Sequence, residues 1–356
     1  MSTVVIGIMA FFMTVGAVDK ALFDNRFGYG REFERGLNTM GPLAMVMVGI
    51  MCAAPALGAC IGPFFGRLFE SVGSDPALFA GMVLGVDMGG LPLAQSMAHS
   101  SEAAVLSGIG LGGTFGCILT YAMPLSLSMC GSESRLDVSK GLVIGIIAAP
   151  LSLFGVGLAE GYAMSSLLKL GMPAFIFAAA VAGALAFFAE KTAQVCLLVS
   201  RFLVGGFILL LAVAALENYF GIVLIPGMAP MGRQFELIGE ISVMLAGAYP
   251  FVLFIQRHFA GLLHAFASFL KIDDSAALGM IVALANPLPT YTLFDQMTRR
   301  GRVICSAFSG PALCLLGDQL GFVSAVYPAG ISALFAGKLI AAVAALIMAL
   351  ALVDAG

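Results

Sequence analysis

The chain has 356 residues, of which 60% are hydrophobic and 10% charged, with a formal net charge of −3. Soluble domains carry about 25% charged residues, so this composition excludes a water-soluble fold, and the absence of a basic tract argues against nucleic-acid binding. Apolar runs close to the ~20 residues that cross a bilayer recur along the chain, which predicts an all-α polytopic membrane protein.

Charged and polar residues divide these runs into about eleven expected transmembrane segments. The segments lie near residues 3–19, 38–66, 76–98, 103–129, 141–164, 170–189, 195–217, 237–256, 275–297, 303–328 and 330–353. Polar loops are expected at 20–37, 131–140, 223–236, 257–274 and 298–302. The first segment follows no basic residue, so it is interpreted as a span and not as a cleaved signal peptide. Arginine and lysine at 20–37 and 298–302 place these two loops in the cytoplasm by the positive-inside rule, which puts the N-terminus outside.

An internal repeat is expected from four weak matches that occur in the same order in both halves. Arg31 and Glu34 correspond to Arg233 and Glu236, a shift of 202 residues, and Gly81 corresponds to Gly279, a shift of 198. The other two matches pair residues 107–108 with 309–310 and 123–128 with 327–332. We therefore expect a first repeat at 1–165, a connecting span at 166–194 and a second repeat at 195–356, as in many secondary transporters. The sequence leaves open whether the repeats are inverted or parallel.

Two of the expected segments are interrupted at corresponding places. The sequence DMGGLP breaks 76–98, and NPLP breaks 275–297. The residues expected to break the helices are Gly89, Gly90 and Pro92 in the first segment and Pro287 and Pro289 in the second. Backbone groups freed in lipid cost several kcal/mol each unless protein or a cavity covers them, so both breaks should face an interior. Paired interruptions of this kind are typical of a transporter binding site.

Polar side chains at the breaks are the first binding candidates. Asp87 is a carboxylate at the expected bilayer centre, where a charge costs about 2.5–3.5 kcal/mol on insertion scales and usually marks function. The alternative is that Asp87 caps a half-helix or pairs with a local backbone donor, because aspartate before two glycines is good capping chemistry. Asn286 could orient a ligand through its amide, or it could bond the backbone gap left by Pro287, and the sequence favours neither.

Four weaker candidates complete the predicted site. Asp318 and Gln319 lie inside the apolar run 303–328, although Asp318 could instead be solvated near an interface. Tyr249 offers a hydroxyl and a ring face for a cation, or it is a packed aromatic beside a kink. Gln95 lies in the first interrupted segment.

Several other patterns carry no separate chemistry. Glycines at spacing four, Gly108, Gly112 and Gly116 among them, predict a close-packing helix face, and such faces would permit a homodimer. The three histidines lack metal spacing, the seven cysteines are interpreted as buried small hydrophobes, and no nucleotide-binding or catalytic motif occurs in a suitable context. We therefore expect no cofactor, no metal and no enzymatic activity.

Five motifs in order, FERGLNTMGPLAMVMVG, FAGMVLGVDMGG, LAGAYP, ALANPLP and LGDQLGF, resemble those of the ethanolamine permease (EutH) family. The resemblance runs from about Glu34 to Lys338. The chain departs from the family pattern at Leu91-Pro92, and its loop at 223–236 is short; neither departure touches the acids.

The resemblance implies a bacterial inner-membrane carrier of ethanolamine. It places Asp87, Asn286, Tyr249 and Asp318 in family motifs. We expect Asp87 to bind the substrate ammonium, Asn286 to orient it, and Asp318 to serve as an exit site or proton carrier. Facilitated diffusion and ion-coupled transport stay open, as do another small amine as substrate and, as a third hypothesis, a membrane-embedded enzyme.

Overall fold

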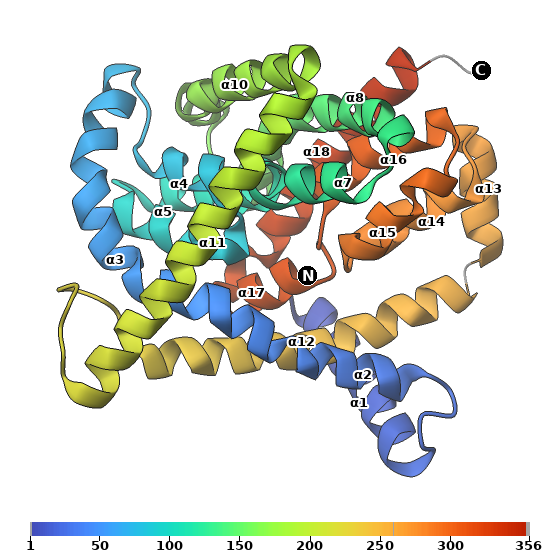
Figure 1. The fold of residues 1–356 in the computed structure, drawn as a ribbon, viewed down its shortest axis with the longest axis horizontal. Coiled ribbons are helices and arrows are strands. Elements are labelled where there is room, and N and C mark those ends of the chain that lie inside the picture. Colours follow the sequence, from blue (N-terminus) through green and yellow to red (C-terminus); the bar gives the residue numbers. More distant parts are fainter. Residues whose placement is uncertain (1, 259, 354–356) are drawn as a thin grey trace.

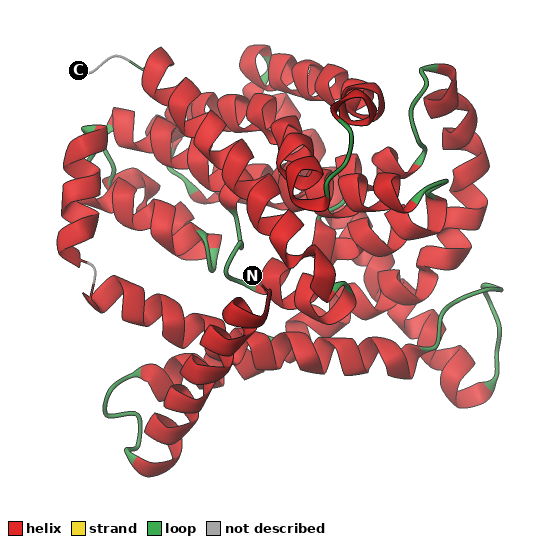
Figure 2. Cartoon of the chain, turned by 180° about the vertical axis from the view of Figure 1, so that it is seen from behind, coloured by secondary structure: helices red, strands yellow, loops and turns green. Residues whose placement is uncertain are grey.

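In the computed structural model, which describes residues 2–258 and 260–353, all regular secondary structure is helical (Figures 1 and 2). The α-helices are α1 (Ser2–Leu22), α2 (Tyr29–Asn38), α3 (Met40–Ser71), α4 (Ala77–Val83), α5 (Leu91–Met97), α6 (Ser101–Val105), α7 (Met123–Met129), α8 (Ser132–Ala148), α9 (Ser152–Glu160), α10 (Met164–Phe187), α11 (Ala189–Phe220), α12 (Met231–His258), α13 (Ala260–Leu270), α14 (Asp274–Ala283), α15 (Pro287–Leu293), α16 (Arg299–Ala312), α17 (Asp318–Val326) and α18 (Ile331–Leu352). Wider π-helical turns form η1 (Val86–Gly90), η2 (Leu106–Gly116) and η3 (Ile118–Ala122).

The expectation of an all-α polytopic membrane protein is confirmed. Among the described residues, 8 helical stretches are long and apolar enough to cross a membrane, and each coincides with one of the eleven expected segments. The other three segments, 76–98, 275–297 and 303–328, consist of pairs of short helices. Eleven complete crossings are therefore not confirmed.

Three of the five expected loops are largely helical in the structure. Residues 20–37 contain most of α2, 131–140 lie almost entirely in α8, and 257–274 contain α13. The prediction was wrong because it used charge to mark the loops, and charge does not break a helix. Glutamate, lysine and arginine are good helix formers, so a polar stretch without proline continues as helix.

The lipid-facing surface is formed by long apolar helices on the outside of the bundle. The diagonal helix α11 exposes large hydrophobic side chains, including Phe202 and Leu209 (Figure 1). Such a surface is unfavourable in water and suits hydrocarbon. The buried side chains gather instead around η2, α8, α16 and α18.

The first interrupted segment is a hairpin that returns to its starting point. Helices α4 and α5 pack against each other, and Asp75 lies at the mouth of the hairpin. Its Oδ1 accepts a hydrogen bond from the Ala77 amide at 2.9 Å, and its Oδ2 accepts one from the His99 amide at 3.0 Å. One buried carboxylate thus joins the chain entering the hairpin to the chain leaving it, so the segment folds back on itself.

The second interrupted segment has the same construction. Asp273 caps α14 by accepting from the Ala276 amide at 3.0 Å. Its other oxygen accepts from the Thr298 amide and hydroxyl at 2.9 and 2.7 Å, beyond the end of α15. Asp75 and Asp273 are 198 residues apart, the shift that also relates Gly81 to Gly279. This parallel is in keeping with the internal repeat, which stays a prediction.

The two hairpins occupy opposite sides of the molecule. In Figure 1, α4 and α5 lie at the left of the bundle and α14 and α15 at the right. Helices α17 and α18 lie between them in this view. Both breaks lie near the start of α17, because η1 contacts α17 and the residues just before α17 donate hydrogen bonds to Ala283 and Leu284.

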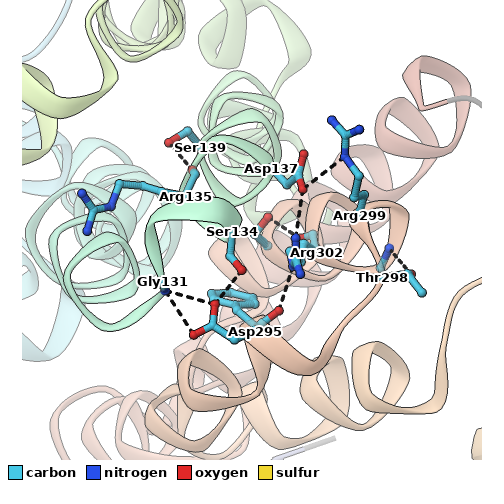
Figure 3. Close-up of polar contacts among 12 residues, drawn as sticks. Gly131, Ser134, Arg135, Asp137, Ser139, Asp295, Thr298, Arg299 and Arg302 are labelled. Carbon is cyan, nitrogen blue, oxygen red and sulfur yellow. Dashed lines mark hydrogen bonds and ion pairs between the residues drawn. The ribbon is translucent and has the colours of Figure 1, made fainter.

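The mouth of the second hairpin is tied to α8 by a polar cluster (Figure 3). The Asp295 carboxylate accepts from the Ser134 hydroxyl at 2.5 Å and from the Gly131 amide at 3.0 Å. These two hydrogen bonds, the first above all, hold the pKa of Asp295 below its usual value. Nearby, Asp137 on α8 lies 3.3 Å from Arg302 and 3.7 Å from Arg299. Polar and charged groups at the mouth thus anchor this hairpin to α8.

Replacing the carboxylate at the second mouth should loosen the protein. Asp273→Ala removes a helix cap and both hydrogen bonds from Thr298, so we expect a loss of about 1–3 kcal/mol of stability and a lower unfolding midpoint in detergent. The adjacent Asp274→Ala is the matched control, because Asp274 pairs only with the exposed ring of His264 and should change stability by less than about 0.5 kcal/mol. Equal midpoints for the two variants would contradict the role given to Asp273.

Candidate functional site

The first break is an unwound turn covered by glycines. Helix α4 ends at Val83, the chain runs extended through Gly85, and Gly89 takes a φ of +91°, which glycine adopts without strain. The break packs against η2, where a Cβ on Gly116 would lie 2.2 Å from the Leu84 carbonyl oxygen. The expected close-packing face of Gly108, Gly112 and Gly116 is confirmed, and it faces this hairpin. Proline 92 falls in the first turn of α5, where it fits a helix.

At the second break, the free backbone carbonyls accept hydrogen bonds from another non-helical segment of the chain. Helix α14 ends at Ala283, and the Cys314 amide donates to the Ala283 carbonyl at 2.9 Å. The Leu316 amide donates to the Leu284 carbonyl at 2.6 Å. These donors come from residues 313–317, which separate α16 from α17. The carbonyls left free at the end of α14 thus accept hydrogen bonds from amides of a second non-helical segment. This pairing avoids the cost of unpaired backbone groups in lipid.

Asn286 performs the capping function that the sequence left open. Its Oδ1 accepts from the Leu288 amide at 3.0 Å, so it begins α15. Pro287 and Pro289 occupy the first turn of that helix, where a proline removes no helical hydrogen bond. The side chain also lines a cavity, so its amide nitrogen remains available to a ligand.

Two acids meet where the breaks converge. Helix α17 contacts η1, which brings Asp318 within electrostatic reach of Asp87. Asp87 is 8% exposed, and its Oδ1 has no hydrogen-bond partner within the described chain. No side chain caps α5, so Asp87 does not cap that helix, but the backbone amides of Asp87 and Met88 lie beside its carboxylate, as the local-donor alternative expects. Asp318 is half-buried and receives a hydrogen bond from the Cys314 thiol.

A buried lysine joins the acids, and the sequence analysis missed it. Lys338 on α18 is 1% exposed, and its Nζ donates to the Gly113 carbonyl and, at 2.7 Å, to Oε1 of Gln319. Nε2 of Gln319 is 3.0 Å from the sulfur of Cys117. A lone lysine inside the apolar run 330–353 was the signal that could have revealed it, because charges within such runs usually mark function.

Tyrosines line the same region. Tyr121 and Tyr249 lie within electrostatic reach of Asp318. Tyr291 is near Tyr121, and its buried hydroxyl has no hydrogen-bond partner among the described residues. An unpaired buried hydroxyl costs free energy, so it is a natural contact for a polar ligand.

A cavity of about 330 Å³ lies beside the second hairpin. Its lining includes Asn286, Pro289, Tyr249, Glu32 and Arg35. Glu32 and Arg35 are 3.4 Å apart, and the Arg35 guanidinium lies 5.3 Å from the ring centroid of Tyr249. The sequence did not single out Glu32 and Arg35, because they fell in a stretch expected to be a loop. We call this cavity the vestibule, since Tyr249 connects it to the region of Asp318.

The structure thus brings together most, but not all, of the predicted site residues. Asp87, Asp318 and Gln319 lie near Lys338 in the centre of the protein, and Tyr249 and Asn286 line the vestibule. Gln95 is exposed on α5, apart from these residues. Within the described chain, no three His, Cys, Asp or Glu side chains are close enough to hold a metal ion.

The chain matches a known family over nearly its whole length. Residues 1–352 match the family described as Ethanolamine utilisation protein, EutH. The chain is 33% identical to the probable ethanolamine permease EutH of Listeria monocytogenes over 342 residues, 96% of this chain and 91% of that protein. It is 35% identical to the probable ethanolamine permease EutH of Escherichia coli over 387 residues, 98% of this chain and 95% of that protein. An uncharacterized protein of Bacillus subtilis, YxeR, is 33% identical over 341 residues, and no solved structure matches.

A side chain at Gly89 should disrupt the first break. Gly89→Ala would strain a φ of +91° and place a Cβ 2.3 Å from Cγ1 of Ile50, so we expect a loss of about 1–3 kcal/mol in stability. Gly62→Ala on α3 is the control, because its Cβ would meet nothing within 4 Å. Thermal unfolding in detergent compares the two, and a Gly89→Ala midpoint equal to that of wild type would refute the need for a glycine here.

Proposed function

The chain belongs to the EutH family of ethanolamine utilisation proteins, and from that premise we propose that it carries ethanolamine across the bacterial inner membrane. The observation that supports this most directly is the buried Asp87 at a broken helix, with one carboxylate oxygen unpaired. An isolated carboxylate in a low-dielectric interior is costly, and a bound cation relieves that cost.

The chemistry of ethanolamine suits the groups that converge here. Alkyl ammonium groups of the lysine type have a pKa near 10.4, so ethanolamine is mostly charged at pH 7. Its ammonium would bind Asp87, and its hydroxyl, two carbons away, would meet an amide or tyrosyl group. Asn286 and Tyr249 offer such groups on the vestibule side.

The route through the protein follows the same residues. In the vestibule, an incoming amine would compete with the Arg35 guanidinium for the Glu32 carboxylate and the ring face of Tyr249. It would then reach Asp318, which interacts electrostatically with both Tyr249 and Asp87. In this proposal Asp318 is the second acid of the path, an exit site or proton carrier.

The proposed architecture is that of two structural repeats, at 1–165 and 195–356, joined by the span 166–194. The repeats would be inverted, because the hairpins enter from opposite sides of the molecule (Figure 1). A binding site at the meeting point of two broken helices is the usual arrangement in carriers built this way.

Transport is tested with purified protein in proteoliposomes. Uptake of labelled ethanolamine without any gradient, insensitive to ionophores, would establish facilitated diffusion; dependence on a proton or sodium gradient would establish coupling. A panel of related amines as competitors tests the choice of substrate. Chemical change of the internalised ethanolamine would contradict a carrier and indicate an enzyme.

Removing the charge at the first break should abolish binding. Asp87→Asn keeps the shape of the side chain and loses the ammonium partner, so we expect saturable ethanolamine uptake to fall at least about 100-fold. Asn286→Ala should weaken affinity less, about tenfold or below, because a neutral contact is worth less than a charged one. Size-exclusion profiles of both variants check folding. Normal uptake kinetics in a folded Asp87→Asn protein would remove Asp87 from the site.

A further inference from the structure

Three formal charges lie close together in the centre of the protein, and they do not cancel. Asp87 and Asp318 lie on the contacting elements η1 and α17, and Nζ of Lys338 is bound by Gln319, the residue next to Asp318. Among the described residues, Lys338 carries the one ammonium that interacts with both carboxylates. The thiols of Cys117 and Cys314 and the phenols of Tyr121 and Tyr249 are further titratable neighbours of the acids. With the three charged groups ionised, the centre holds one excess negative charge.

Lys338 is fixed in place by groups other than the acids. Its Nζ is bound by the Gly113 carbonyl of η2 and by Oε1 of Gln319 at the start of α17. The ion pairs of the described chain, with N–O distances up to 4.0 Å, lie elsewhere. The ammonium therefore acts on both carboxylates through the low-dielectric interior without blocking either of them. Oδ1 of Asp87 remains unpaired as a result.

We propose that Lys338 is a specificity-determining residue, whose fixed ammonium offsets one of the two central carboxylates so that the site accepts one monovalent amine and excludes a diamine. This inference rests on the proposed function and adds to it the charge class of the substrate. A single ammonium makes the centre neutral, whereas a second ammonium on the same ligand would face Lys338 without a free carboxylate. Like charges brought together in a dry site repel strongly.

The experiment compares two ligands of equal length, 3-amino-1-propanol and 1,3-diaminopropane, as competitors of labelled ethanolamine on purified protein. They differ in one terminal group, a hydroxyl against a second ammonium. Wild type should prefer the amino alcohol. In Lys338→Met the ratio of the two inhibition constants should move toward the diamine by about tenfold or more. Lys338→Arg should keep the wild-type preference, and Lys140→Met, an exposed lysine on α8, should leave the ratio unchanged.

Restoring the charge balance gives a further test. Lys338→Met combined with Asp318→Asn again leaves one excess carboxylate, so the preference for the amino alcohol should return. A folded Lys338→Met protein with the wild-type ratio would overturn the inference.

If Lys338→Met does not fold, the ethanolamine affinity of the single variant Asp318→Asn tests the inference. It leaves one carboxylate against one lysine, and ethanolamine affinity should fall about tenfold or more. Unchanged affinity in this folded variant would overturn the inference. Wild type that binds no amine would instead refute the proposed function, so the two failures are distinguishable.

Discussion

The fold depends on hydrogen bonds to the backbone groups that the interrupted helices leave unpaired inside a membrane. Each interrupted helix frees carbonyl and amide groups that lipid cannot solvate. At the second break, the amides of Cys314 and Leu316 pair with the carbonyls of Ala283 and Leu284. At the first, the glycine face of η2 lies against the unwound turn so closely that no side chain would fit at Gly116. These contacts place both breaks beside the chain that begins α17, and the buried charged groups lie in the same region.

The charges follow from the same geometry. A carboxylate or ammonium in a bilayer interior is tolerated when it faces other polar groups and not hydrocarbon. Lys338 meets a carbonyl of the π-helical element η2 and the side-chain amide of Gln319 in the first turn of α17. Such π-helical turns frequently occur at functional sites, since they redirect backbone groups. The unusual helices and the buried charges are therefore one feature.

Sequence patterns predicted the membrane class, eight of the spans, both breaks and the glycine face. They also selected Asp87 and Asp318, because an acid in an apolar run is conspicuous. They did not predict that 76–98 and 275–297 turn back. Hydropathy measures the length of an apolar run and not its direction, and the signal for return was polar: Asp75 and Asp273 at the mouths. A seven-residue helix rises only about 10 Å, a third of the hydrocarbon thickness.

The two halves have the same construction and different chemistry at their breaks. In the first, Asp87 leaves a carboxylate oxygen unpaired. In the second, the Asn286 oxygen is used to begin a helix, and a neutral amide faces the vestibule. A site built from one charged and one neutral break has two chemically different ends. Ethanolamine also has two different ends, an ammonium and a hydroxyl. In a carrier of this kind, the asymmetry between two related hairpins would orient the substrate, which two identical breaks could not do.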